Sequence, residues 1–281
     1  MTVIVVTGAT GRLGGRVAAR LSAAGVPQRL IVRDPARAPQ LPGSSVSTAD
    51  YGDASALRQA LDGAGTVLMV SAAETPDRVR QHQTFVDAAA AAGVGHLVYT
   101  SFQGAAPDAV FTLARDHWAT EEHIRASGLA FTFLRDSLYA DFLPFMVGED
   151  NVIRGPAGDG RAAVVAQDDI ADTAVAVLQR PDAHAGRTYD LTGPSALTFA
   201  EMAAIITDVT GRAVRYHAES VSEAYASRAS YGAPDWQVDA WVSTYTAVAA
   251  GQLAEVSPAV EQLTGRPATS LSQLLQAGGA A

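Results

Sequence analysis

The chain contains no cysteine, and all 20 of its basic residues are arginine. Without cysteine there is no disulfide and no thiolate metal site, which permits a cytoplasmic location without requiring it. Without lysine there is no Schiff base and no phosphate-binding P-loop lysine. These two absences exclude several classes of enzyme.

Basic charge is scarce as well, because 29 acidic residues outnumber the 20 arginines and the formal net charge is −9. Such a charge repels phosphate backbones and anionic lipids, so we expect neither nucleic acid nor a membrane as partner. No apolar run approaches the roughly 20 residues of a membrane helix. The N-terminal segment is typical of a strand and not of a signal peptide. We expect a cytoplasmic protein, either a monomer or a homodimer.

What the chain does contain is an alternation of short β-branched runs and helical stretches. Its 281 residues, 48% of them hydrophobic, suffice for one large α/β domain with an appendage. The expected strands are apolar throughout, which is typical of strands covered by helices on both faces. We expect strands at 3–7, 28–33, 66–71, 96–101, 129–135 and 189–193, and helices at 12–24, 54–61, 75–92 and 170–178. This order predicts an α/β fold with a doubly wound parallel sheet.

The pattern changes after Gly193 to helical stretches with exposed aromatic residues. We therefore expect a first domain over 1–193, with part of 137–165 contributing to a second lobe. Residues 194–281 form that smaller, mostly helical lobe.

A glycine-rich turn closes the first predicted strand and opens the first predicted helix. In this context the first glycine permits the tight turn, the middle one lets backbone approach a pyrophosphate, and the last allows close packing of the helix. The helix N-terminus then faces the anion. The turn predicts a dinucleotide-binding Rossmann fold, with the ligand held by Gly8, Thr10, Gly11, Arg12, Leu13 and Gly14.

The end of the second predicted strand indicates which dinucleotide is bound. In an NAD site an acidic residue at this position forms hydrogen bonds with the ribose hydroxyls. Here the strand ends at Arg33 instead. A guanidinium is suited to a 2′-phosphate, with Arg12 and Arg37 as helpers. The cofactor we expect is NADPH or NADP+. The alternative is that Arg33 is a solvated surface arginine.

Polar and small residues follow two further strands at the carboxyl edge, where ligands bind in such sheets. Asp50 and Tyr51 follow a third strand, expected between residues 33 and 50, and could border the adenine. Ser71 and Ala72 end the fourth strand, the one expected at 66–71, beside the expected ribose and nicotinamide path. Ordinary turns and helix caps are the alternative for both pairs.

At these residues the chain resembles the atypical short-chain dehydrogenase/reductases, specifically the NmrA-like group that includes bacterial NADPH-dependent quinone reductases. The resemblance extends over stretches 7–14, 32–35, 49–51, 91–94, 98–101, 127–129, 133–135, 169–171, 191–194 and 263–267. It implies an NADP(H)-binding domain and a C-terminal lobe that encloses the substrate cleft.

The chain departs from the wider superfamily because the Tyr-x-x-x-Lys proton-donating pair is impossible without lysine. Glu122 stands where many relatives carry lysine, and Asp136 where asparagine or proline is commoner. Reducing a ketone produces a very basic alkoxide, whereas a quinone produces a phenolate-like anion comparable to tyrosine, of pKa about 10. Quinones and conjugated aromatic carbonyls are therefore the favoured acceptors. The alternative is a regulatory protein that senses NADP(H) without turnover.

Three side chains are candidates for contact with the substrate. Ser101 ends the fifth strand and could bond the substrate oxygen or the nicotinamide amide. His117 could be an acid or donor that titrates near neutrality, or a surface histidine. Tyr139 could face the nicotinamide or the substrate, or be an interface aromatic. Tyr99 shares a strand face with Ser101, and core packing is its expected role. We expect no metal, because no His-Glu-x-x-His motif is present.

Overall fold

The computed structural model describes residues 3–278. Seven strands form one sheet in the order β3-β2-β1-β4-β5-β6-β9. The pairs β1–β2, β1–β4, β2–β3 and β4–β5 are all parallel. The strands are β1 (Val3–Thr7), β2 (Gln28–Val32), β3 (Ser44–Thr48), β4 (Ala64–Met69), β5 (His96–Phe102), β6 (Ala130–Asp136) and β9 (Arg187–Leu191). The predicted doubly wound fold is confirmed.

The chain divides into two compact units. The first comprises Met1–Ser101, Asp116–Arg135 and Gln167–Tyr189. The second comprises Phe102–Arg115, Asp136–Ala166 and Asp190–Ala281. The boundaries expected from the sequence, 1–193 and 194–281, stay a prediction of how the chain is divided by function.

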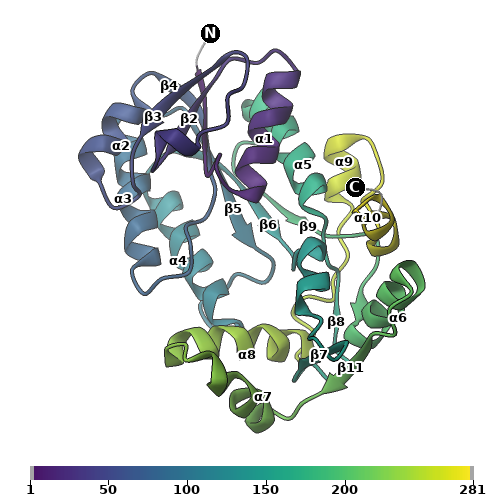
Figure 1. Cartoon of the computed structure of the whole chain (residues 1–281). Helices are drawn as coiled ribbons and strands as arrows, with labels where there is room; N and C mark the ends of the chain where they lie inside the picture. Colours follow the sequence, from purple (N-terminus) through teal and green to yellow (C-terminus); the bar gives the residue numbers. More distant parts are fainter. Residues whose placement is uncertain (1–2, 279–281) are drawn as a thin grey trace. The chain divides into compact units, whose positions relative to one another are not determined.

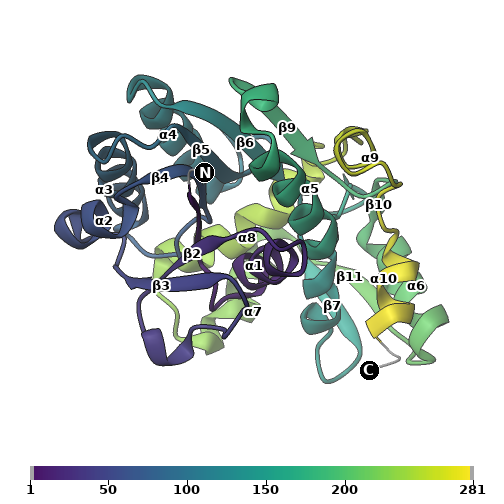
Figure 2. The ribbon, with the colours of Figure 1, turned by 90° about the horizontal axis from the view of Figure 1, so that it is seen from above.

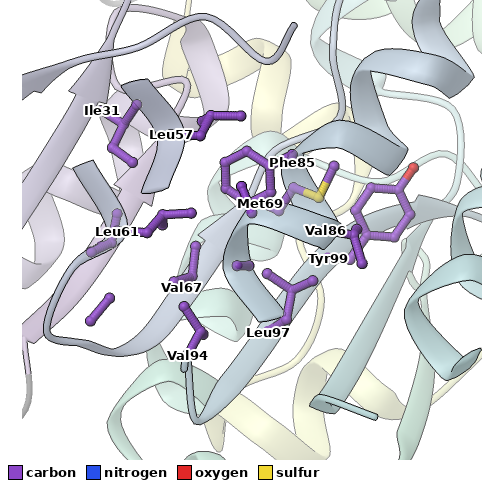
Figure 3. Packing of buried hydrophobic residues seen from close by; sticks show 14 of the residues in the cluster. Ile31, Leu57, Leu61, Val67, Met69, Phe85, Val86, Val94, Leu97 and Tyr99 are labelled. Carbon is purple, nitrogen blue, oxygen red and sulfur yellow. The ribbon is translucent and has the colours of Figure 1, made fainter. Parts of the chain in front are cut away.

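Helices cover both faces of the sheet in the first unit. On one face lie α2 (Ala54–Leu61), α3 (Arg78–Ala91) and the part of α4 (Thr112–Ala126) that belongs to this unit. Their apolar residues pack with alternate residues of the strands in one buried cluster that includes Leu57, Phe85 and Ile124. Figure 3 shows this packing, with the Tyr99 ring at one end and its hydroxyl directed away from the other labelled side chains.

On the opposite face, α1 (Arg12–Ala23) lies beside α5 (Gln167–Gln179), as both views of the chain show (Figure 1 and Figure 2). The buried side of α1 carries Leu13, Val17 and Leu21 at helical spacing. Its outer side carries Arg20, whose guanidinium lies 2.6 Å from Asp168 and 2.5 Å from Asp172 on α5. The two helices are thus joined by apolar packing at the sheet and by ion pairs at the surface.

The second unit is built mainly from helices around its own core. Its helices are α6 (Phe199–Thr210), α7 (Val221–Arg228), α8 (Asp235–Ala249), α9 (Ala259–Thr264) and α10 (Leu271–Gly278), with the 3-10 segments η2 (Ala140–Met146) and η4 (Ala229–Tyr231). Phe199, Met202, Tyr245 and Val248 are buried there. Thr198 and Glu201 form a capping box that begins α6.

Two short ladders that the sequence analysis did not anticipate lie in the second unit. Strands β7 (Val152–Gly155) and β11 (Arg215–Ala218) pair in parallel, and β8 (Arg161–Ala162) pairs with β10 (Leu197–Thr198) in antiparallel. These strands have two or four residues each, too few for a clear alternation of apolar and polar positions. The sequence signal for a strand was therefore absent.

Candidate functional site

The glycine turn forms a tight bend between β1 and α1. Gly8 has a φ of +64°, a conformation that side-chain-bearing residues rarely adopt, and its carbonyl accepts a 2.8 Å hydrogen bond from the amide of Gly11. A Cβ at Gly14 would lie 2.4 Å from the Gly8 oxygen. The absence of side chains at both positions therefore allows the first turn of α1 to lie directly against the bend.

The backbone N–H groups in the first turn of α1 donate to no side chain of the N-cap residue. Gly11 is the N-cap, and it has no side chain that could accept from the first turn. The α1 dipole adds partial positive charge at the same place. This end of the helix is suited to an anionic group such as a pyrophosphate.

A cavity of about 310 Å³ opens at the carboxyl ends of β1, β2, β3 and β4. Every residue that the sequence predicted for the cofactor lines it, except Ser101: Gly8, Thr10, Gly11, Arg12, Leu13, Gly14, Arg33, Asp50, Tyr51, Ser71 and Ala72. Arg37, expected as a helper, does not line it. Four strand ends that are far apart in sequence thus meet around one cavity.

Tyr51 joins three of these strand ends. Its hydroxyl lies 2.5 Å from Oγ1 of Thr7, at the end of β1, and donates to the carbonyl of Val70, just after β4, at 2.7 Å. The amide of Val70 in turn donates to Thr7 Oγ1 at 2.9 Å. Burial raises the pKa of the Tyr51 phenol, so it remains a neutral donor. Tyr51 therefore lines the cavity and also connects the ends of β1 and β4 through hydrogen bonds.

The segment after β4 is fixed by side chains from two other elements. The amide of Ser71 donates to Oγ1 of Thr100 at 2.9 Å, and the amide of Ala72 donates to Nε2 of His82 at 2.8 Å. Arg78 Nε donates to the carbonyl of Ala72 at 3.0 Å. Buried polar side chains thus set the backbone path where the ribose and nicotinamide were expected.

His82 lies within the packed interface between α3 and the sheet. Its Nε2 accepts from Ala72, so Nδ1 carries the proton that faces Oγ1 of Thr120 at 2.8 Å. Burial, reinforced by the charge of Arg78, lowers the pKa of His82 to about 3. His82 is therefore neutral at pH 7.

His117 is buried on α4 and not at the surface. Arg78 Nη2 faces its Nε2 at 3.0 Å, and the Tyr99 hydroxyl faces its Nδ1 at 2.9 Å. Because a guanidinium only donates, Nε2 is the acceptor and the ring is neutral. Burial and the charge of Arg78 hold the pKa of His117 well below its ordinary value. This environment differs from the expected one, in which His117 titrates near neutrality.

Ser101 is buried at the end of β5, and its hydroxyl donates to Oε1 of Glu121 at 2.6 Å. The Glu121 carboxylate has no exposed surface and also accepts from Nε and Nη2 of Arg135 at 2.8 and 2.6 Å. Arg125 adds a contact to Glu121 at 3.1 Å. In this structure the Ser101 proton is directed at a protein carboxylate, so toward any other group the hydroxyl can only accept.

Glu122, the neighbour of Glu121 in the chain, lies outside this cluster. Half of its side chain is exposed, and its carboxylate lies 2.5 Å from Nη1 of Arg125. The residue therefore forms a surface ion pair one helical turn from its partner. It supplies none of the buried contacts that surround Ser101.

Tyr139 belongs to the second unit, immediately before η2. Its hydroxyl donates to Oδ2 of Asp136 at 2.9 Å. Asp136 is buried, and within the described residues its Oδ1 has no hydrogen-bond partner. Burial raises the pKa of Asp136 to about 8, although the Tyr139 bond opposes that shift. Tyr139 is thus attached to a carboxyl group that holds a proton at neutral pH.

Among the residues at or near the cavity that sequence reasoning missed are Thr75, Arg78 and His82. Thr75 lines the cavity, and its buried Oγ1 lacks a hydrogen-bond partner within the described part of the chain. Arg78 and His82 are four residues apart on the α3 face that also carries Phe85. Polar residues on the apolar face of a helix were the signal that could have identified them.

In residues 3–278 no group of three or more His, Cys, Asp or Glu side chains is placed to hold a metal ion. Within the same residues, no helix has the length and apolar character needed to cross a membrane.

The amino-acid sequence matches a family model over most of its length. A model of the NmrA-like family matches residues 1–236. The chain belongs to the NmrA-like family. The resemblance inferred from the turn and the scattered motifs is therefore confirmed, and the family match includes all the residues that line the cavity.

Members of the NmrA-like family with similar sequences are named as reductases. The chain is 35% identical to quinone oxidoreductase 2 of Escherichia coli K12, over 96% of each chain. It is 33% identical to the NAD(P)H azoreductase of Xenophilus azovorans, over 99% of this chain and 98% of that one. The crystal structure of the Escherichia coli NADPH-dependent quinone oxidoreductase in complex with NADPH superposes with a TM-score of 0.90, covering 98% of this chain and 99% of that one.

Proposed function

We propose that the chain is an NADPH-dependent reductase of quinones and conjugated aromatic compounds. The observation that carries the proposal is the composition of the 310 Å³ cavity: a glycine turn, a helix N-terminus and the exposed Arg33 at the end of β2 line one space. The relatives named as a quinone oxidoreductase and an azoreductase support the same class of reaction.

The residues present fit NADPH. A Cβ at Gly14 would meet the Gly8 carbonyl oxygen at 2.4 Å, so glycine there keeps the N-terminus of α1 against the bend that lines the cavity. Thr75 offers a buried hydroxyl oxygen with no protein partner among the described residues. The N-terminal amides of α1 would hold the pyrophosphate, and Arg33 would hold the 2′-phosphate by charge-assisted hydrogen bonds. When bound, NADPH supplies a hydride.

The oxygen that hydride transfer leaves negative on the acceptor must be weakly basic, because a chain without lysine cannot form the Tyr-x-x-x-Lys proton-donating pair. A reduced quinone leaves a phenolate-like oxygen, which water or a phenol can protonate near neutral pH. We assign that proton to water, because the Tyr139 hydroxyl, like that of Ser101, donates its own proton to a carboxyl group of the protein, that of Asp136. His117 is neutral and buried, so we assign it to positioning Arg78 and Tyr99 and not to proton donation.

Steady-state oxidation of NADPH by the purified protein tests the proposal. We expect turnover with 1,4-naphthoquinone, menadione and an azo dye, no measurable turnover with cyclohexanone, and a preference for NADPH over NADH. Saturable NADPH binding without turnover of any of these acceptors would contradict the reductase and support the NADP(H) sensor instead.

A further inference from the structure

Arg78, the first residue of α3, is a buried charge directly beside the dinucleotide site. Its side chain is 5% exposed, and it does not line the 310 Å³ cavity. Its Nε donates to the carbonyl of Ala72 at 3.0 Å, and Ala72 does line the cavity. The guanidinium therefore contacts the backbone of the cavity wall without being part of the wall itself.

The positive charge of Arg78 is only partly neutralised by its partners. Two of them, the Ala72 carbonyl and the His117 ring, are uncharged acceptors. Among residues 3–278 the carboxylate within ion-pair distance is that of Asp116, 3.5 Å from Nη1, and Nη1 makes no hydrogen bond within the same residues. The Asp116 side chain is 27% exposed, so water screens the negative charge more than the positive one. A net positive potential results around Arg78.

Two histidines respond to that potential. Burial is the largest cause of the lowered pKa of both His82 and His117, and the charge of Arg78 is the next largest for each. The His82 ring also contacts the cavity wall, because its Nε2 accepts from the amide of Ala72. Additional positive charge is therefore disfavoured at both rings near Arg78.

The strand order shows which end of the dinucleotide site this charge adjoins. β1 pairs with β2 on one side and with β4 on the other. Arg33 follows β2, the glycine turn follows β1, and Ala72 follows β4. In such sheets a dinucleotide lies across the point where the strand order reverses. With the 2′-phosphate at Arg33 and the pyrophosphate at the turn, as proposed above, the nicotinamide half would extend toward the segment after β4.

The two oxidation states of the cofactor differ in charge at that half alone. The nicotinamide ring of NADP+ is a cation, whereas the ring of NADPH is neutral, and the phosphates and adenine are the same in both. A protein charge beside the phosphates therefore changes both affinities alike. A protein charge beside the ring changes their ratio.

We propose that Arg78 is a specificity-determining residue for the oxidation state of the cofactor, because its buried charge weakens the binding of NADP+ relative to that of NADPH. The inference rests on the proposed function for the identity of the cofactor, but it requires no turnover. Its consequence for a reductase is that the oxidised product dissociates more readily than the reduced substrate.

Isothermal titration of the full chain with NADPH and with NADP+ tests the role of Arg78. We expect NADPH to bind about 10-fold more tightly, the order of magnitude of one like-charge repulsion in a partly buried site. This ratio corresponds to a rise of about 30 mV in the potential of the bound couple. Arg78→Gln should reduce the ratio to less than about 3-fold, and Arg78→Lys, which keeps the charge, should retain it.

Three further variants separate charge from structure. Thr100→Val removes the acceptor of the Ser71 amide without changing any charge, so it should weaken both dinucleotides by similar factors. Arg80→Gln removes an arginine of α3 whose side chain is 73% exposed, and it should change the ratio less than about 2-fold. Asp116→Asn removes the negative partner of Arg78 and should raise the ratio about 3-fold. This variant tests the inference even if thermal unfolding shows that Arg78→Gln does not fold.

Adenosine 2′,5′-bisphosphate, which lacks the nicotinamide half, is the third ligand and should bind the parent protein and Arg78→Gln equally well. Equal weakening of all three ligands in Arg78→Gln, or a ratio that falls in Asp116→Asn, overturns the role of Arg78 even if the protein reduces quinones. A ratio that follows the charge at position 78, without NADPH oxidation by any acceptor, leaves the inference standing and overturns the reductase. Absence of binding by either dinucleotide overturns both.

Discussion

The carboxylate of Glu121 accepts two hydrogen bonds from Arg135, at 2.8 Å from Nε and 2.6 Å from Nη2. Glu121 belongs to α4 and Arg135 to β6, so the pair attaches a helix to the sheet. Ser101 on β5 donates to the same carboxylate. A single buried charge thus connects two neighbouring strands and the helix that covers them.

Removing that charge should destabilise the first unit strongly. In Glu121→Ala the half-buried Arg135 guanidinium loses its bidentate partner, and breaking a pair whose carboxylate is fully buried costs up to about 3–5 kcal/mol. Unfolding in urea, followed by circular dichroism, measures the loss. The adjacent Glu122→Ala removes only an exposed pair and should cost less than about 1 kcal/mol. Similar losses in the two variants would contradict the structural role of Glu121.

Gly14→Ala should abolish NADPH binding. Its Cβ would lie 2.4 Å from the Gly8 carbonyl oxygen and would move the N-terminus of α1 away from the bend. Gly52→Ala is the matched control, because the nearest atom to its added Cβ is the Asp50 carboxylate at 3.4 Å. Quenching of protein fluorescence by NADPH compares them. Retained affinity in Gly14→Ala would show that the bend does not hold the cofactor.

Arg33→Ala should reduce the preference for NADPH over NADH. A hydrogen bond to a charged group contributes about 1.5–3 kcal/mol, so the ratio of kcat/KM values should fall about 10- to 100-fold, mainly by weaker NADPH binding. Arg37→Ala, outside the cavity, should leave the ratio unchanged. An unaltered ratio in Arg33→Ala would mean that another group recognises the 2′-phosphate.

Asp136→Asn should stabilise the protein increasingly as the pH rises. The folded-state pKa of Asp136 is about 8, above its ordinary value of 3.8. The protonated carboxyl therefore contributes stability that is complete below pH 3.8 and is lost as the pH rises toward 8, by at most about 1.4 kcal/mol per pH unit. Asparagine keeps an acceptor for Tyr139 and does not ionise. The free energy of unfolding should be measured for both proteins at pH 5 and pH 9. The value for the variant minus that for the parent protein should be larger at pH 9, and an equal difference at both pH values would contradict the raised pKa.

His82→Gln should show the opposite dependence on pH. The pKa of His82 is lowered to about 3 from its ordinary 6.5. The neutral ring therefore makes its full contribution to the free energy of unfolding above pH 6.5, and that contribution is lost as the pH falls toward 3. The variant should be less stable than the parent at pH 7, because glutamine places its oxygen poorly for the Ala72 amide. That deficit should shrink at pH 4.5 in urea unfolding. A deficit that grows on acidification would mean that His82 is charged in the folded chain.

Predictability from the sequence differed between local and non-local features. The helix at 54–61 was predicted with its observed bounds, and the turn at Gly8 lies where its spacing placed it. Ser101 was correctly placed at the end of β5, but its bond to Glu121 joins segments 20 residues apart and left no trace in local spacing. Arg78 and His82 were overlooked because polar residues in a helix are ordinarily solvated.

The sequence by itself determined the cofactor-binding part of the site. It has a glycine bend before α1, an arginine in place of an acidic residue at the end of β2, and no lysine. These features are set by backbone sterics and residue identity, which act over a few positions. The tertiary structure decided which polar groups are charged. His82, His117 and Asp136 have ordinary side chains whose pKa values shift because packing removes water and brings partners from distant segments. Desolvation is a property of the folded environment, so no spacing in the chain could have revealed it.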